Sequence, residues 1–234
     1  MSATSRNGAG RLREALVLGK GTLAIKVADW FARSPDWDLI AVVPTIPEPP
    51  WTDSLVAWAE QNDVAYVKSG RYDELPGVDE EGWSVDLAVS VTYDRIIPGW
   101  FIDKCGQIIN IHNSPLPRYR GVSPINWALK NGESMHGVTI HEITPGIDDG
   151  PVIAQLQYSI YPELDEVVDV YRRALEYGWV LFEQTMPLLD KVDPVAQDEG
   201  QATYYSRKQD ALLGERRSFT RAESLRALAT GGGD

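Results

Sequence analysis

The chain alternates short apolar runs with segments in which apolar residues recur every three or four positions. The short runs predict buried strands at 14–19, 38–43, 66–67, 86–91, 108–112, 137–143 and 152–160. The longer spacing predicts helices at 23–33, 54–62, 165–189 and from Pro124 onward. Strands that alternate with helices are typical of an α/β fold. We therefore predict a Rossmann-like, mostly parallel sheet with helices on both faces, followed by a short C-terminal appendage.

Two local features refine this prediction. Asp53 precedes the second helix and is expected to cap it. The long helix carries an apolar stripe that should face the core, formed by Val168, Tyr171, Leu175, Trp179, Phe182 and Met186.

Composition narrows the class of protein. Of the 234 residues, 43% are hydrophobic and 24% are charged, as in soluble globular proteins. The net charge of −12 argues against a general nucleic-acid or anionic-membrane binder. Cys105 is the single cysteine, which excludes an intrachain disulfide, and no run approaches the roughly 20 apolar residues of a membrane helix. The first residues lack a secretory apolar segment, so we expect a cytoplasmic protein.

Polar residues on the apolar run 108–112 predict a site. Asn110 and His112 lie two positions apart on a strand and therefore point to the same side. A loop rich in Pro, Arg and Gly follows them, and the turn Pro-Gly-Ile-Asp-Asp-Gly ends near Gly150. Because ligands of α/β sheets bind beyond the carboxyl ends of the strands, we expect the site at this position.

The motifs here resemble a known family. Asn-Ile-His-Asn-Ser-Pro-Leu-Pro-Arg-Tyr-Arg-Gly from Asn110, Gly-Val-Thr-Ile-His from Gly137 and Ile-Asp-Asp-Gly-Pro from Ile147 are similar to motifs of the N10-formyltetrahydrofolate-dependent formyltransferases. That family includes glycinamide ribonucleotide transformylase, methionyl-tRNA formyltransferase and the sugar N-formyltransferases. The resemblance is dense over 86–155. It implies a catalytic domain over 14–193, with a disordered tail at 1–13 and the appendage at 194–234.

The resemblance also implies the catalytic roles. Formyl transfer needs a donor to the developing oxyanion, a group that moves protons and a carboxylate that orients the imidazole. Asn110, His112 and Asp148 match the family positions for these three tasks. Asp149 is the adjacent competitor, but the alignment of the turn favours Asp148. A 2-His-1-carboxylate metal site made of His112, His141 and Asp148 is an alternative, whereas the resemblance points to metal-free chemistry.

The other two histidines have weaker claims. We expect His136 in an exposed turn, solvated, and we expect His141 to serve packing or the shape of the pocket.

N10-formyltetrahydrofolate is the implied co-substrate, and the segment after the fourth strand resembles the family's pterin-binding stretch. The predicted cofactor-binding residues are Tyr93, Arg95, Ile96, Ile97, Ile143, Thr144 and Gly146. Ordinary core packing of Ile96 and Ile97 is the alternative.

Two further segments are expected to bind the acceptor. Backbone amides of the strand-to-helix turn would hold an anion, and the loop after His112 would border the amine. The predicted residues are Gly19, Lys20, Gly21, Thr22, Ser114, Arg118, Arg120 and Gly121. The alternatives are a sharp turn for the first segment and a rigid loop with solvated arginines for the second.

The acceptor is expected to be a primary amine of a small molecule. The segment from Tyr119 to Glu133 resembles aminosugar and methionyl-tRNA formyltransferases, so a nucleotide-linked aminosugar is the first choice. Glycinamide ribonucleotide is second, and an amino acid, peptide or aminoacyl group is third. Pro115 departs from the family's common Ser-Leu-Leu-Pro, so the acceptor side is expected to differ in shape.

The basic appendage leaves two interpretations open: a docking tail, or a binding surface in which Tyr204, Tyr205 and the arginines hold a nucleotide. Methionyl-tRNA formyltransferases carry a larger extra domain at this place, which weakens the tRNA interpretation. A different class of protein, a non-catalytic folate- or nucleotide-binding module, would be expected to lose one of the three catalytic residues. An NAD-dependent oxidoreductase would need a fuller glycine fingerprint. The partners are therefore expected to be folate and an amine, with no membrane and with a homodimer left open.

Overall fold

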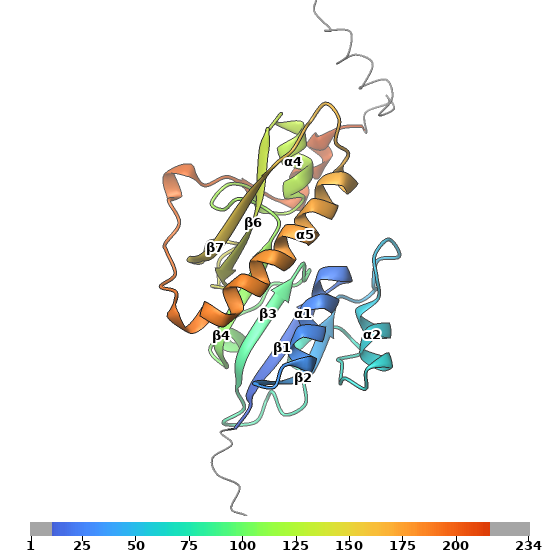
Figure 1. The fold of residues 1–234 in the computed structure, drawn as a ribbon, viewed down its shortest axis with the longest axis vertical. Coiled ribbons are helices and arrows are strands. Elements are labelled where there is room, and N and C mark those ends of the chain that lie inside the picture. Colours follow the sequence, from blue (N-terminus) through green and yellow to red (C-terminus); the bar gives the residue numbers. More distant parts are fainter. Residues whose placement is uncertain (1–10, 216–234) are drawn as a thin grey trace, which may run out of the picture. The chain divides into compact units, whose positions relative to one another are not determined.

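The computed structural model describes residues 11–215 of the chain, which pack as two compact units (Figure 1). The described residues of the first unit are 11–94 and Asp103–Ile108, and those of the second are Arg95–Ile102 and 109–215.

The first unit is a parallel β/α arrangement. Its elements are β1 (Arg13–Gly19), α1 (Gly21–Arg33), β2 (Trp37–Pro44), α2 (Leu55–Gln61), the 3-10 helix η1 (Tyr72–Glu74), β3 (Val85–Val91) and the first half of β4 (Cys105–His112). Strand β1 pairs in parallel with both β2 and β3. Four successive side chains of β1, at 15–18, have no exposed surface, so both faces of this strand are covered. Helix α1 packs against β1, β2 and β3 (Figure 1).

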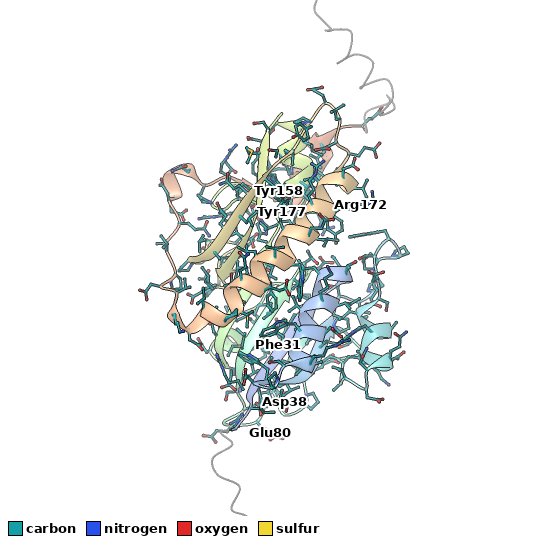
Figure 2. The ribbon with its side chains drawn as sticks, in the orientation of Figure 1. Phe31, Asp38, Glu80, Tyr158, Arg172 and Tyr177 are labelled. Atoms are coloured by element: carbon teal, nitrogen blue, oxygen red, sulfur yellow. The ribbon has the colours of Figure 1, made fainter. Side chains whose placement is uncertain are left out.

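The second unit is built on antiparallel strands. Its elements are α3 (Gly99–Ile102), the end of β4, β5 (Arg120–Gly121), α4 (Pro124–Lys130), β6 (Met135–Glu142), β7 (Val152–Ser159), α5 (Val167–Thr185), η2 (Met186–Lys191), η3 (Glu199–Gln201), β8 (Tyr204–Tyr205) and η4 (Arg207–Leu213). Strand β6 pairs antiparallel with β4 and with β7. Helix α5 packs on β6 and β7, where Tyr177 stacks on Tyr158 with ring centroids 4.9 Å apart (Figure 2).

Strand β4 has residues in both units; the strand order is β2-β1-β3-β4 in the first unit and β4-β6-β7 in the second. The predicted Rossmann-like, mostly parallel sheet is confirmed, with β6 and β7 as its antiparallel edge. The short strands β5 and β8 pair in parallel with each other as a separate ribbon.

The start of α2 differs from the prediction. Ser54, not Asp53, is the N-cap, and its Oγ accepts a hydrogen bond from the Ala57 N–H at 2.9 Å. The carboxylate of Glu48 accepts from the first backbone N–H of the helix, that of Leu55. Asp53 instead accepts from the Thr22 hydroxyl at 2.6 Å, which ties this loop to α1. Ser54 and Glu48 together therefore supply the capping that the sequence assigned to Asp53.

The long helix is shorter than predicted and faces the core along a different stripe. It ends at Thr185 because Pro187 follows, and the chain continues as η2. Val168 is 45% exposed, which contradicts its assignment to the core. The buried face consists of Val170, Ala174, Gly178, Leu181, Phe182 and Thr185. Small residues on this face let the helix approach the sheet closely, while the larger ones flank it.

The remaining differences are local. The strand expected at 66–67 is a single bridge between Tyr66 and Val42. The domain boundaries at 14–193 and 194–234 stay predictions, and most of the predicted tail at 1–13 lies outside the described residues. Among residues 11–215 no helix is long and apolar enough to cross a membrane.

Candidate active site

Strands β4 and β6 bring together the polar side chains of the second unit. The antiparallel register places Asn110 opposite His141 and His112 opposite Thr139. Directly opposed residues of such a pair project to the same face, so Asn110, His112 and His141 share one face. His112 is 8% exposed and His141 only 2%. Burying polar groups costs free energy unless they form hydrogen bonds or ion pairs, so these side chains need partners.

Asp148 is the common partner. Its Oδ1 lies 3.6 Å from His112 Nδ1, 3.6 Å from His141 Nε2 and 3.5 Å from Asn110 Nδ2. Its Oδ2 accepts a hydrogen bond from the Gly121 N–H at 2.8 Å. Asp148 itself has a positive φ of 52°, in the left-handed region that Asp tolerates better than most residues. The structure thus brings Asn110 and His112 to the carboxylate of Asp148, the third residue predicted to be catalytic.

The tautomer of His112 follows from its second contact. Nε2 lies 2.9 Å from the backbone oxygen of Tyr119, and a carbonyl oxygen can only accept, so Nε2 carries a hydrogen. Nδ1 is therefore the ring atom that faces Asp148 and gains or loses a proton. In the charged form of the ring, the Nδ1–H points toward the carboxylate.

His141 orients the amide of Asn110 by the same logic. Its Nδ1 donates to the Glu142 carbonyl at 2.8 Å, so Nε2 of the neutral ring is an acceptor. The Asn110 Nδ2 group lies 3.2 Å from that acceptor, which directs the amide N–H groups toward His141 and Asp148. We expected His141 to serve packing or the shape of the pocket; in the structure it also contacts the amide of Asn110. Only the strand register, which the sequence did not reveal, places it opposite Asn110.

The electrostatics of Asp148 favour its ionised form. Burial by itself raises the pKa of the carboxyl, but His112, His141 and the Gly121 N–H stabilise the anion and hold the pKa well below its ordinary value of 3.8. Asp149 is different: it is exposed and accepts a hydrogen bond from Thr144 Oγ1. The geometry thus favours Asp148 over its neighbour, as the alignment did.

No three His, Cys, Asp or Glu side chains within the described part of the chain are arranged to hold a metal ion. The alternative of a metal site at His112, His141 and Asp148 therefore gains no support from the geometry.

The matches to known proteins agree with this site. A model of the family described as "Formyl transferase" matches residues 62–185, which is more than half of the chain and includes the whole cluster. The chain belongs to the formyl transferase family. The resemblance found in the sequence motifs is thereby confirmed.

Curated relatives in the family include methionyl-tRNA formyltransferases. That of Deinococcus radiodurans is 38% identical over 121 residues, which are 51% of this chain and 37% of that protein. That of Ehrlichia ruminantium (strain Gardel) is 38% identical over 127 residues, 53% of this chain and 41% of that protein. The chain thus spans about two fifths of the length of these curated relatives.

Solved formyl transferases share the fold. A sugar 3N-formyl transferase, WlaRD, solved in the presence of dTDP and 5-N-formyl-THF, is 25% identical with a TM-score of 0.75, over 89% of this chain and 74% of that chain. The N-formyltransferase of Helicobacter canadensis matches at 24% identity and a TM-score of 0.72, over 93% and 80% of the two chains. Glycinamide ribonucleotide transformylase 1 of Symbiobacterium toebii matches at 22% and 0.62, over 80% and 94%.

The loop after His112 is held from within the protein. Ser114 is fully buried and its Oγ donates to the Arg118 carbonyl at 2.8 Å. Arg120 is 8% exposed, and its guanidinium is engaged by Gln197 and Glu199. Because their polar groups are engaged within the protein, the predicted acceptor-binding roles of Ser114 and Arg120 gain no support from these contacts and stay predictions. Arg118 is exposed and pairs with Glu133, while Gly121 contributes its N–H to Asp148.

The predicted folate-binding residues of the second unit lie in two segments, 95–97 and 143–146. Ile96 is 71% exposed, whereas its neighbour Ile97 is buried, so the alternative of two core residues is wrong for Ile96. Arg95 is exposed, and Ile143 and Thr144 follow the end of β6. A Cβ at Gly146 would lie 1.9 Å from the carboxylate of Asp149, an exposed side chain that would have to move. The binding roles of these residues stay predictions.

Tyr93 and the predicted anion turn belong to the first unit. The Tyr93 hydroxyl donates to the Gly70 carbonyl at 2.6 Å. Lys20 Nζ contacts both carboxylate oxygens of Asp94, at 2.5 and 2.6 Å. With the Thr22 hydroxyl bonded to Asp53, both polar side chains of the Gly19–Thr22 turn already serve a carboxylate. An anion there would have to compete with Asp94, so the predicted role of this turn gains no support.

His136 contradicts its prediction outright. It is fully buried rather than solvated, and its Nε2 donates to the Asn113 carbonyl at 2.8 Å. Its ring lies between Tyr119 and Tyr158, with edge contacts at centroid distances of 6.1 and 6.0 Å. Burial lowers its pKa to about 4. The sequence placed His136 in a turn because Gly137 follows it, but β6 begins at Met135.

Proposed function

We propose that this formyl transferase moves the formyl group of N10-formyltetrahydrofolate to the primary amine of a nucleotide-linked aminosugar. The observation that carries the proposal is the carboxylate of Asp148, 15% exposed, with His112 and Asn110 gathered on its Oδ1. The cluster supplies the oxyanion donor, the proton carrier and the orienting anion that this chemistry needs. A non-catalytic binding module would not need a buried, ionised carboxylate beside two histidines.

The proposed steps assign one task to each residue. As the amine nitrogen bonds to the formyl carbon, the carbonyl π pair moves onto the oxygen, and an Asn110 N–H donates to it. Its contact with Asp148 is long, at 3.5 Å, so this N–H is the one free to turn toward the oxygen. The C–N10 bond then breaks, and N10 receives a proton while the amine loses one.

His112 carries that proton through Nδ1, since Nε2 is committed to Tyr119. Asp148 favours the charged ring and lowers the cost of holding the proton between the two steps.

Two features support an aminosugar as the acceptor. WlaRD, the relative with the TM-score of 0.75, is a sugar formyl transferase solved with dTDP. The ring of Tyr204 is 48% exposed and lies against Gly121, whose N–H holds Asp148, so it offers a stacking surface for a nucleobase. Tyr205, in contrast, stacks on Tyr119 and Trp127 and serves to dock the appendage.

Aminoacyl transfer is the second candidate, because methionyl-tRNA formyltransferases are 38% identical over 121 and 127 residues of this chain. Glycinamide ribonucleotide is the third. The small-molecule proposal includes a cytoplasmic location and no membrane partner.

An acceptor panel tests the proposal. The protein is incubated with N10-formyltetrahydrofolate and, separately, dTDP- and UDP-linked aminosugars, glycinamide ribonucleotide and methionyl-tRNA, and both tetrahydrofolate release and the mass of the formylated product are measured. We expect turnover with at least one aminosugar. Turnover with another amine while all aminosugars stay silent would refute the acceptor. Silence with every amine, with no binding of the folate, would refute formyl transfer itself.

A further inference from the structure

A segment distant in sequence holds the loop that orients His112 and Asp148. We call residues 197–205 the strap. It bonds to the backbone of residues 119–122 through three hydrogen bonds: Tyr119 N–H to Thr203 Oγ1 at 2.7 Å, Arg120 N–H to the Thr203 carbonyl at 2.9 Å and Val122 N–H to the Tyr205 carbonyl at 2.9 Å.

The loop passes this support on to both catalytic side chains. The N–H groups of Arg120 and Val122 donate to the strap, whereas the N–H of Gly121 between them donates to Asp148 at 2.8 Å. The Tyr119 carbonyl accepts from His112. The strap therefore fixes the two backbone groups that set the positions of the imidazole and the carboxylate.

Close contact of strap and loop depends on a glycine. Gly121 has a φ of +91°, and a Cβ there would lie 2.1 Å from the Tyr205 carbonyl oxygen. Only a residue without a side chain allows this approach.

Gln197 connects the strap directly to the Asp148 turn. Its Nε2 donates to the carbonyls of Asp148 at 2.9 Å and Gly150 at 2.7 Å. Its Oε1 accepts from Arg120 Nε at 3.1 Å and from Nη2 at 2.8 Å. All four hydrogen-bonding positions of the amide are thereby used. Such a satisfied network specifies a single arrangement of the groups it joins.

Arg120 anchors the other side of this network. Besides Gln197, its guanidinium contacts Glu199 through Nη1 at 3.0 Å and Nη2 at 2.6 Å. Glu199 of the strap thus pairs its carboxylate with the buried guanidinium of Arg120.

We propose that Gln197 is a positioning residue of the reaction, which locks the turn of Asp148 to the loop at Arg120 and so holds the carboxylate against His112. The kinetic part of this inference rests on the proposed function, whereas the structural part does not.

The test compares Gln197→Met with Gln201→Met. Gln201 lies in the same strap, and its Nε2 donates to Asp198 at 2.7 Å rather than to the Asp148 turn. For Gln197→Met we expect kcat to fall about 10- to 100-fold with an acceptor KM within about twofold, because a small misplacement of a catalytic group is costly. Gln201→Met should keep kcat within about twofold.

Gln197→Glu separates two roles of the amide. The carboxylate keeps the acceptor for Arg120 but loses both N–H donors, and it faces two carbonyl oxygens. If locking the turn matters, this variant is as impaired as Gln197→Met. Recovery of wild-type kcat in Gln197→Glu would show that Gln197 serves only Arg120 and would overturn the proposal.

Hydrogen exchange of the Gly121 amide supplies a readout that needs no catalysis. We expect its exchange to accelerate about tenfold or more in Gln197→Met and Gln197→Glu, and to be unchanged in Gln201→Met. Unchanged exchange in both Gln197 variants overturns the positioning role. Faster exchange in a protein that transfers no formyl group to any amine would refute the proposed function and leave the structural role intact. If Gln197→Met does not fold, Gln197→Glu is judged by the same two measurements.

Discussion

Asp148 shows how one residue organises the proposed reaction centre. Its φ is positive, the Gly121 N–H donates to its Oδ2, and Asn110, His112 and His141 lie around its Oδ1. Because its pKa is depressed, the ionised carboxylate adds stability at pH values above 3.8, and that stability is lost as pH falls further toward the folded-state pKa. Asp148 therefore stays charged across the whole range in which an imidazole titrates.

We expect Asp148→Asn to lower kcat about 10²- to 10⁴-fold, because the amide can no longer favour the charged form of His112. The matched control is Asp149→Asn, in which an exposed carboxylate bonded to Thr144 is neutralised, and kcat should change less than about twofold. Steady-state kinetics and circular dichroism of both variants check this. Equal losses in the two variants would mean that charge near the turn, and not the contact with His112, controls the rate.

Part of this residue-level arrangement is visible in the sequence. Asn110 and His112 are two apart on a strand, so their common side follows from the alternation of side chains. The partnership of Asn110 with His141 does not follow, because it requires the register of β4 on β6. Likewise, the fate of Arg120 depends on Gln197 and Glu199, which lie almost eighty positions away. Local pattern carries no information on such contacts.

At the scale of elements, β6 carries two histidines with different consequences. His141 serves the site, whereas His136 is a neutral ring buried between two tyrosines. Its pKa of about 4 lies below the ordinary value of 6.5, so the unfolded chain binds a proton that the folded chain refuses. The associated stability is fully present above pH 6.5 and is lost as pH falls toward 4.

This loss should be measurable in His136→Phe. From pH 7 to pH 4.5, His136 should cost the wild type about 2–3 kcal/mol of unfolding free energy, and the variant should lack that share of the decrease. At neutral pH the variant should be less stable than the wild type, because the Asn113 carbonyl loses its donor. Urea unfolding at several pH values gives both quantities. Parallel pH profiles for the two proteins would contradict the assignment.

Element boundaries were predicted better than element faces. Strands β1, β2, β3 and β4 lie within a few residues of the apolar runs, because a buried parallel strand needs a continuous apolar segment. The buried stripe of α5 was predicted wrongly, because the prediction followed the large apolar residues. Ala174 and Gly178, which are small, belong to the buried face. The strap was predicted only in part. A docking tail was one of two interpretations of the appendage, and the pairing of β8 with β5 could not be predicted because it depends on the folded loop.

The whole molecule is acidic, and this bears on the acceptor. With a net charge of −12, the chain repels a polyanion over most of its surface. Part of the basic stretch noted in the appendage, from Arg216 onward, lies outside the described residues. The methionyl-tRNA relatives are matched over only 37% to 41% of their length.

We therefore expect no saturable binding of tRNA at concentrations up to about 10 µM in 150 mM salt, because few phosphates would be neutralised. Fluorescence anisotropy with labelled tRNA, repeated at lower salt, checks this. Tight binding with a steep dependence on salt would favour the aminoacyl acceptor and count against the aminosugar.

The bare backbone at Gly121 has a practical consequence. A single methyl group at this position would act as a wedge between strap and loop, since the Tyr205 oxygen occupies the space it needs. Such a protein would retain every side chain of the reaction centre while their alignment is lost. Gly121→Ala is thus a suitable variant for crystallising the protein with both the folate and the acceptor amine bound and unreacted.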